Sequence, residues 1–251
     1  MNYKGACDKN ETKTQDFVSD FYEEVRYQKP YSWLYQSWWF KKMIDLAKPP
    51  IDGLLLDDGC GTGHLAEFLD KNNLIGLDIS AGMLKYAQKR MPLIVNGDAQ
   101  NLPFKDGIFD CVFARALLHH LPEPARGVAE IERVLKTGGR VIFCDTLYSV
   151  LSALPRAIVN KKSEHFSEDH KNLRESEILN MIKPYLKIKR IYYFGYIAYP
   201  LLGFPDVLDI FKFFPLKNFL AKLLIKIDEF IGAIPLIKKQ AWGIMVIAEK
   251  R

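Results

Sequence analysis

Short apolar runs alternate with amphipathic stretches through the middle of the chain, between about residues 53 and 146. Such alternation favours parallel strands joined by crossover helices. The pattern predicts strands at 53–58, 73–80, 92–98, 109–116 and 140–146, and helices at 64–71, 81–91 and 124–139. Gly138 and Gly139 are expected to end the last of these helices just before the fifth strand.

Both ends of the chain depart from this rhythm. Residues 14–48 are predicted to be helical in two pieces broken near Pro30, and the second piece is rich in aromatic residues. The remaining elements are expected as an insertion at 147–170, a helix at 174–186, a strand at 187–199, an insertion at 200–239 and a strand at 241–250. We therefore predict an α/β fold with a Rossmann-like, doubly wound, seven-stranded and mostly parallel sheet. Its last strand is expected to be antiparallel, with N-terminal helices and helical insertions after strands 5 and 6.

The first predicted strand ends at two aspartates and runs into a glycine-rich turn. The spacing is Asp57-x-Gly59-x-Gly61-x-Gly63. Glycine is required where the backbone turns sharply or where a ligand lies against the main chain. A strand, a glycine turn and a helix in this order place a ligand at the carboxyl end of a parallel sheet.

The spacing and charge of this turn distinguish two classes of ligand. The dinucleotide fingerprint is G-x-G-x-x-G and holds a pyrophosphate, whereas this turn reads G-x-G-x-G beside two carboxylates. Charges a few ångströms apart interact by roughly 1–4 kcal/mol at surface-like dielectrics. A pyrophosphate would be repelled here, while a ligand with an ammonium and a sulfonium would be attracted. The turn therefore favours S-adenosylmethionine over a dinucleotide.

Acidic residues also end the next two predicted strands. Asp78 lies nineteen residues after Gly59, where its carboxylate can accept hydrogen bonds from both hydroxyls of a ribose. Asp98 can accept from an adenine amino group, with Ala99 and Leu102 beside the ring. Each acid alone also fits a strand end or a helix cap. Their occurrence at three consecutive strand ends favours an adenosine ligand.

Five segments together resemble a known family. They are "LLLDDGCGTGHLAEFL", "GLDIS", "NGDAQNLPF", "FDCVFARALLHHL" and "RVLKTGGRVIFCD". They are similar to the successive motifs of class I S-adenosylmethionine-dependent methyltransferases, in the small-molecule and lipid branch that includes the ubiquinone/menaquinone methyltransferases. The resemblance covers roughly residues 50–146.

The resemblance implies S-adenosyl-L-methionine as cofactor, with S-adenosyl-L-homocysteine as product. The cofactor-binding residues that it implies are Asp57, Gly59, Cys60, Gly61, Gly63, Asp78, Ile79, Met83, Asp98, Ala99 and Arg115. Asp57 would anchor the methionine end, Asp78 the ribose, and Asp98 with Ala99 the adenine. The segment from Arg115 to Leu117 would line the methionine side, although the family pattern does not require Arg115 and its role is open.

One methyltransferase domain is expected to span 1–251. Residues 1–49 would form an N-terminal helical cap, 50–146 the cofactor-binding core, and 147–251 the acceptor-side insertions and final strands. We predict methyl transfer to a small, hydrophobic or lipid-like acceptor, because two apolar insertions flank the expected pocket. The acceptor, the attacking atom and the oligomeric state are not identified by the sequence.

The catalytic base is not identified by the sequence either. A hydroxyl or ammonium nucleophile needs a base, and the weak candidates are His119, His165 and His170. His119 and His120 are adjacent, so at most one is expected to face the pocket. His119 also fits a structural role. His165 and His170 lie in the first insertion, with Glu164, Glu168 and Asp169 as conceivable partners.

Two apolar segments are candidates for the acceptor side. One stripe of residues recurs at helical spacing in the second insertion: Phe219, Leu220, Leu223, Leu224, Ile227, Phe230, Ile231 and Ile234. It predicts a helix packed on the sheet or capping the pocket; the alternative is a lid for an apolar acceptor that rests on a membrane. Aromatic candidates for the other wall are Tyr22, Tyr27, Tyr31 and Trp33.

Charge and cysteine content refine the location. The segment from Lys183 to Arg251 contains 12 Lys/Arg and 5 Asp/Glu, whereas the first 182 residues contain 23 Lys/Arg and 25 Asp/Glu. This balance suits an anionic partner or a membrane surface, or lysines that solvate outer helix faces. The four cysteines are far apart, so neither a metal site nor a disulfide framework is indicated, and a reduced cytoplasmic location is expected. Neither a signal-peptide core nor a transmembrane helix is expected, and peripheral membrane contact remains an alternative.

Three alternatives remain open. A nucleic-acid methyltransferase fits the basic C-terminal part, but "ARALLHHL" lacks the N/D-P-P-Y/F/W-type motif that holds a flipped base. A non-catalytic protein that binds S-adenosylmethionine would keep the same acids and glycines. A dinucleotide oxidoreductase fits the fold alone, and the turn spacing and charge disfavour it.

Overall fold

The computed structural model describes residues 12, 13, 15, 16, 19, 22–150, 152, 173–203, 205 and 209–251. Its centre is a seven-stranded sheet in the order β3-β2-β1-β4-β5-β7-β6. The strands are β1 (Leu55–Asp58), β2 (Leu74–Asp78), β3 (Leu93–Asn96), β4 (Phe109–Arg115), β5 (Leu135–Thr146), β6 (Lys187–Phe194) and β7 (Gly243–Glu249). β7 is antiparallel to both β5 and β6, and the pairings among β1 to β5 are parallel. The predicted fold class is therefore confirmed.

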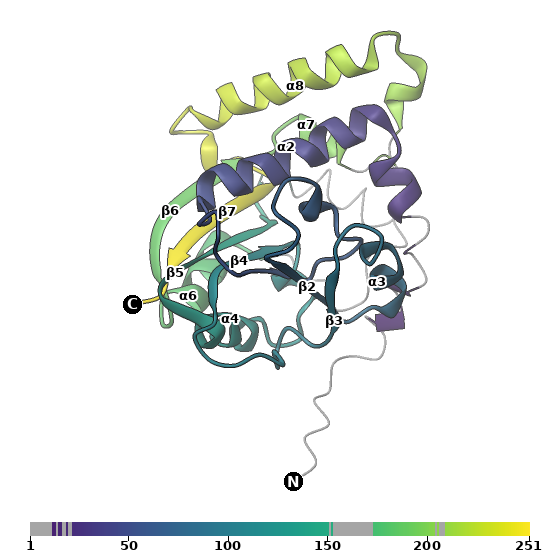
Figure 1. Cartoon of the computed structure of the whole chain (residues 1–251). Coiled ribbons are helices and arrows are strands. Elements are labelled where there is room, and N and C mark those ends of the chain that lie inside the picture. The colour runs from purple at the N-terminus through teal and green to yellow at the C-terminus, as the bar shows by residue number, and fades with distance from the viewer. Residues whose placement is uncertain are drawn as a thin grey trace.

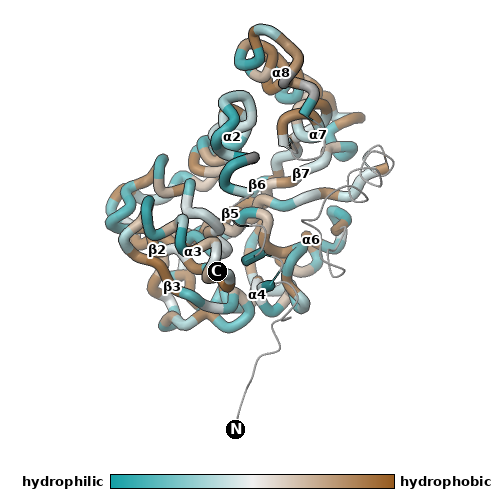
Figure 2. The backbone as a smooth tube through the Cα atoms, turned by 90° about the vertical axis from the view of Figure 1, so that its right-hand side faces the viewer, coloured by the Kyte–Doolittle hydropathy of each residue, from teal (hydrophilic) through white to brown (hydrophobic). Residues whose placement is uncertain are grey.

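Helices cover both faces of the sheet (Figure 1). The helical elements are η1 (Glu23–Tyr27), α2 (Pro30–Ala47), η2 (His64–Glu67), α3 (Ala81–Ala87), η3 (Leu118–His120), α4 (Pro124–Val134), α6 (Glu175–Ile182), α7 (Ala198–Leu202), η4 (Ile210–Phe213), α8 (Lys217–Gly232) and η5 (Lys238–Gln240). The core cluster on one face includes α2, α3 and α7, and the cluster on the other face includes α4 and α6. Helix α8 lies outside α2 and α7 as a further layer (Figure 2).

The predicted break in the N-terminal helices is confirmed, and it has a local cause. Pro30 occupies the first turn of α2, where its missing N–H costs nothing. Eight residues of α2 are buried along one side of the helix: Tyr31, Ser32, Tyr35, Gln36, Trp39, Phe40, Met43 and Ala47. Burial of a large apolar side chain contributes about 1.5–3 kcal/mol, so this side fastens α2 to the sheet. Lys48 then takes a left-handed conformation and Pro49-Pro50 follows, which ends the helix.

Two predicted helices are shorter than expected. The segment 64–71 forms only the 3₁₀ turn η2, because Phe68 N–H donates to the Leu65 carbonyl and the Asp70 side chain then caps a turn. Helix α4 ends at Val134 rather than at the glycines. Leu135 already pairs with Phe109, and the glycines lie in an irregular stretch of β5 before the ladder resumes.

The C-terminal part also corrects two boundaries. The strand predicted at 187–199 ends at Phe194, and α7 begins at Ala198. The helix predicted at 174–186 is α6, which ends at Ile182. Most of the insertion at 147–170, including His165 and His170, lies outside the described residues. Among the described residues, no helix combines the length and apolar character needed to cross a bilayer.

Candidate active site

A cavity lies where the order of the sheet reverses. Strands β2 and β3 follow on one side of β1 and β4 follows on the other, so the loops at their carboxyl ends diverge and leave a crevice. The lining residues come from the ends of these strands together with η1, α2, η2, α3, η3 and α7. Ten of the eleven predicted cofactor-binding residues line this cavity: Asp57, Gly59, Cys60, Gly61, Asp78, Ile79, Met83, Asp98, Ala99 and Arg115.

The glycine turn has three residues with positive φ: Gly59 at 74°, Gly61 at 54° and Gly63 at 81°. The Gly59 and Cys60 N–H groups donate to the Leu77 carbonyl, which ties the turn to β2. A Cβ on Gly61 would meet no atom within 4 Å, so its main chain is open. Gly63 does not line the cavity. A Cβ there would lie 2.9 Å from Ala87 Cα, so Gly63 serves the close packing of the turn on α3.

The two aspartates that end β1 have different surroundings. Asp57 lines the cavity, is 4% exposed, and its carboxylate forms no hydrogen bond to a described residue. Burial raises its pKa to about 7, although the nearby Arg115 lowers it. Asp58 is fully buried, and neither of its carboxylate oxygens has a hydrogen-bond partner among the described residues. Burial and the charge of Asp57 raise the pKa of Asp58 well above its usual value. Of these two aspartates, only Asp57 therefore offers a carboxylate to a ligand.

Asp78 and Asp98 line the same cavity, but their carboxylates already accept hydrogen bonds from backbone N–H groups. The Asp78 carboxylate accepts from Gly61 N–H at 2.8 Å and from Ser80 N–H at 2.9 Å. Burial raises the pKa of Asp78, and these backbone bonds oppose the shift. Asp98 accepts from Gln100 N–H at 2.8 Å. Each carboxylate oxygen has two lone pairs, so these contacts leave capacity for ligand hydroxyl or amino groups.

Arg115 reaches the cavity from the end of β4. Its guanidinium donates to Tyr27 Oη at 3.2 Å and to the Gln36 side-chain oxygen, and it lies over the rings of Trp39 and Phe40. Three buried donors here have no acceptor among the described residues: Arg115 Nε, Gln36 Nε2 and Trp39 Nε1. Arg115 and Trp39 line the cavity, and buried donors without partners are costly, so these two side chains fit an oxygen-bearing ligand group.

Aromatic side chains also line the cavity. Tyr22 and Tyr27 are among them, as the sequence suggested. Tyr31 and Trp33 are not: Tyr31 donates to Asp209, and Trp33 packs against His64 and Phe68. The sequence interpretation missed Trp39, Phe40, Met43 and Tyr199, which also line the cavity. Helix α8 contributes no lining residue, so the lid interpretation of its apolar stripe was wrong for the described cavity.

His119 lines the cavity and forms a pair with a buried acid. Its Nδ1 contacts the Asp145 carboxylate, which also accepts from the Leu118 and Thr146 N–H groups. Burial opposes ionisation of Asp145, but the contacts with His119, the Thr146 N–H and the nearby His120 together lower the Asp145 pKa. His120 also lines the cavity, contrary to the expectation that one histidine at most would face it.

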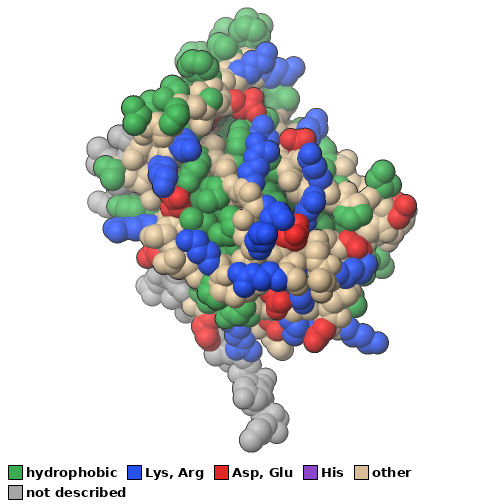
Figure 3. Space-filling model, turned by 90° about the vertical axis from the view of Figure 1, so that its left-hand side faces the viewer, with side chains coloured by type: hydrophobic (Ala, Val, Ile, Leu, Met, Phe, Trp, Pro, Cys, Tyr) green, Lys and Arg blue, Asp and Glu red, His purple; other side chains and the backbone are tan. Residues whose placement is uncertain are grey.

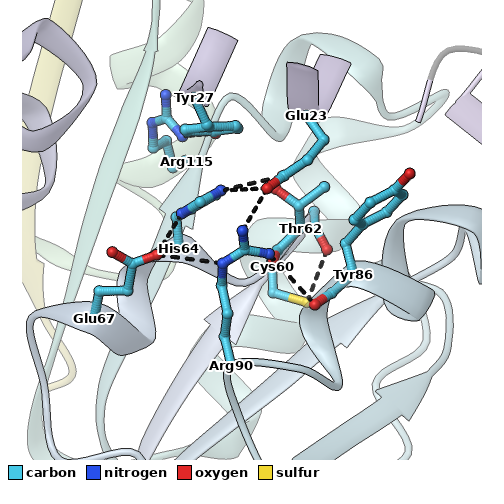
Figure 4. Close-up of polar contacts among 10 residues, drawn as sticks. Glu23, Tyr27, Cys60, Thr62, His64, Glu67, Tyr86, Arg90 and Arg115 are labelled. Atoms are coloured by element: carbon cyan, nitrogen blue, oxygen red, sulfur yellow. Dashed lines mark hydrogen bonds and ion pairs between the residues drawn. The ribbon is translucent and has the colours of Figure 1, made fainter. Parts of the chain in front are cut away.

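A polar network fastens the N-terminal segment to the glycine turn (Figure 4). His64 lies between the carboxylates of Glu23 and Glu67, at 3.1 and 2.7 Å, and Arg90 bridges the same two acids. Tyr27 stacks on His64 with ring centroids 3.8 Å apart. Burial opposes ionisation of Glu23, but the contacts with His64 and Arg90 lower its pKa overall. No local sequence pattern predicts this network, because Glu23 and Arg90 are far from His64 in sequence.

A crevice at the switch point, an acidic glycine turn and acids at three strand ends define a nucleoside-binding α/β domain. A family model described as a methyltransferase domain matches residues 56–143. The uncharacterized protein MJ1123 of Methanocaldococcus jannaschii is 34% identical over 146 residues, covering 57% of this chain and 69% of that protein. The chain belongs to the class I S-adenosylmethionine-dependent methyltransferases, whose cofactor is S-adenosylmethionine.

Other similar proteins carry more specific names. The demethylmenaquinone methyltransferase of Renibacterium salmoninarum is 34% identical over 143 residues, covering 51% of this chain and 60% of that protein. A crystal structure from Thermotoga maritima, titled a SAM-dependent methyltransferase and possible histamine N-methyltransferase, has a TM-score of 0.64 at 18% identity. That alignment covers 96% of this chain and 100% of the other, and it shows the shared fold. The chain spans 44–60% of the length of the demethylmenaquinone methyltransferases that it matches.

Proposed function

We propose that this protein transfers the methyl group of S-adenosylmethionine to a small hydrophobic acceptor of the prenylated-quinol type. The observation that carries the proposal is that one cavity has two kinds of lining residue, which come from different elements. Acids and glycine backbone come from the carboxyl ends of β1 to β3, and we call these residues the acidic part. The N-terminal helices and α7 supply the aromatic part, which is Tyr22, Tyr27, Trp39, Phe40 and Tyr199. The similarity to demethylmenaquinone methyltransferases supports the same acceptor class.

The acidic part suits the charges of the cofactor, which supplies an electrophilic methyl group on a sulfonium. The Asp57 carboxylate would hold the α-ammonium of the methionine moiety, and Asp78 and Asp98 the ribose and adenine. Arg115 faces the same cavity and interacts electrostatically with Asp57. We therefore assign Arg115 to the α-carboxylate. The Asp57 carboxylate and the Arg115 guanidinium then match the two opposite charges of the methionine moiety.

The aromatic part would hold the acceptor ring and its apolar chain. In-line transfer requires the attacking atom to be positioned at near-attack distance, and packing between large rings achieves this without polar groups. A phenolic acceptor must also lose a proton. His119 is the candidate base, because Asp145 fixes its Nδ1 side and so assigns proton transfer to Nε2.

Radiolabelled S-adenosylmethionine tests the proposal. Purified protein is incubated in detergent with demethylmenaquinol, a prenylated hydroquinone, histamine and tRNA in separate reactions. Label in the quinol or hydroquinone supports the proposal. Label only in histamine or tRNA rejects the acceptor class, and binding of S-adenosylmethionine without transfer to any of the four acceptors supports a non-catalytic binding protein.

His119→Asn separates the role of the base from binding. We expect turnover of a phenolic acceptor to fall by about 10²–10⁴-fold, since this is the usual contribution of a positioned general base. Cofactor affinity should be unchanged. The same loss in cofactor affinity and in turnover would instead assign His119 to a structural role.

A further inference from the structure

The outer surface around α8 exposes a concentration of large hydrophobic side chains. Nine of the fourteen exposed large hydrophobic residues in the described part of the chain fall between residues 213 and 237. They are Phe213, Phe214, Leu216, Phe219, Leu223, Ile227, Phe230, Leu236 and Ile237, and we name this set the outer face. Single exposed apolar residues are ordinary, but a contiguous group marks an interaction surface.

The packing of α8 fixes the outer face away from the core. Its buried residues are Ala221, Ile225 and Asp228, and the helix contacts α2 and α7 on that side. The Asp228 carboxylate accepts backbone N–H groups of residues 196–198 at 2.8–3.1 Å, which joins α8 to the start of α7. The orientation of the helix is therefore set by contacts that do not involve the outer face.

The exposed residues of α8 share one side of the helix. At 100° per residue, Phe219, Leu223 and Phe230 fall within roughly 40° of one another, opposite the buried side. Phe219 is 63% and Phe230 is 72% exposed. Figure 3 shows hydrophobic side chains gathered at the end of the molecule where α8 lies in Figure 1, with basic side chains near them.

The charges beside the outer face are predominantly positive. Lys217, Lys222 and Lys226 form no ion pair with any residue in the described ranges. The acids of α8 are already engaged: Asp228 is buried, and Glu229 binds Lys42 at 3.0 Å. Lys238 and Lys239 follow the helix, and Lys239 pairs with Glu175. The surface therefore combines apolar side chains with uncompensated cations.

We propose that the outer face docks the protein on the surface of an anionic lipid bilayer. Exposed Phe and Leu side chains would enter the boundary between headgroups and acyl chains, and the lysines would contact lipid phosphates. A second copy of the chain is disfavoured as occupant, because it would bring the same lysines face to face. This proposal holds whichever acceptor the active site takes, since no residue of the outer face lines the cavity among the described residues.

Vesicle sedimentation tests the docking surface with the full chain. Binding to phosphatidylcholine vesicles is compared with binding to vesicles that also contain phosphatidylglycerol, at low and high salt. We expect preference for the anionic vesicles and weakening by salt. Phe219→Ser/Phe230→Ser and Lys222→Gln/Lys226→Gln should each reduce binding by about tenfold or more, because the first removes side chains that enter the bilayer and the second removes cations that contact lipid phosphates.

Matched controls change the same residue types elsewhere. Ile51→Ser/Leu93→Ser removes exposed apolar groups outside the outer face, and Lys71→Gln/Lys105→Gln removes exposed lysines outside it. Both should bind like wild type, and all variants should keep the same affinity for S-adenosylmethionine. The proposal is overturned by equal binding to neutral and anionic vesicles or by losses of equal size in the controls. It is also overturned by light scattering that shows a dimer which only Phe219→Ser/Phe230→Ser dissociates.

Discussion

The two parts of the cavity are built in different ways. The cofactor part comes from one continuous stretch, from Asp57 to Ala99, in which backbone turns at strand ends fix the positions of the acids. The aromatic part is assembled from η1 and α2, near the start of the chain, and from α7, which follows them by more than a hundred residues. Local geometry therefore defines the first part, whereas long-range packing defines the second. Variants in the two parts should fail differently.

The largest expected effect is on the cofactor side. Asp57→Asn removes the buried carboxylate that faces the ligand while keeping its shape. We expect affinity for S-adenosylmethionine to fall about 100-fold, or about 3 kcal/mol, because a buried charge partner is lost. Isothermal titration calorimetry measures this. Asp106→Asn changes an acid that is exposed and paired with Arg133, and should leave affinity unchanged; unchanged affinity in Asp57→Asn would contradict the site.

Two glycines of the turn should differ in how much their substitution lowers the unfolding free energy. Gly63→Ala forces a Cβ to within 2.9 Å of Ala87 Cα at a φ of +81°, so we expect a loss of about 2–3 kcal/mol in unfolding free energy. Gly61→Ala meets open space and should lose about 1 kcal/mol, from its positive φ alone. Chemical denaturation measures both. An equal loss in the two variants would show that the close contact with α3 does not matter.

Arg115 interacts with Asp57 and also lies over Trp39 and Phe40, so its substitution tests which part of the cavity it serves. Arg115→Gln should weaken S-adenosylmethionine binding by about 30-fold, since a hydrogen bond to a charged group contributes about 2 kcal/mol. Decarboxylated S-adenosylmethionine lacks the proposed partner, so its affinity should be the same in the variant and the wild type. If both ligands lose affinity equally, Arg115 supports the aromatic wall rather than the carboxylate.

The cofactor part was largely predictable from sequence, and the rest of the cavity was not. Strand-end acids and glycines lie within local motifs, and ten of eleven predicted residues line the cavity. Tyr199 carries no local signal, because it reaches the cavity only after α7 folds back over α2. The apolar stripe at 219–234 predicted an amphipathic helix, but it did not predict which side of that helix is buried. The buried side instead contains Asp228, whose backbone partners lie thirty residues earlier.

The smallest effect concerns pH and tests the electrostatic basis of the cofactor part. Burial raises the pKa of Asp57 from 3.8 to about 7, so the folded state holds a proton that the unfolded chain releases. This carboxyl should therefore make the free protein less stable as pH rises from about 4 to about 7. A cationic ligand favours the ionised form, and its binding should release a proton below the folded pKa.

Affinity for S-adenosylmethionine should accordingly increase about tenfold between pH 6 and pH 8, since only the ionised fraction binds well. Calorimetry in buffers of different ionisation enthalpy should detect proton release at pH 6 and almost none at pH 8. Asp57→Asn should abolish the pH dependence along with most of the affinity, whereas Asp106→Asn should retain both. Proton release that persists in Asp57→Asn would assign the titration to Asp78, whose pKa is also raised by burial, and would move the charge match from the methionine end to the ribose.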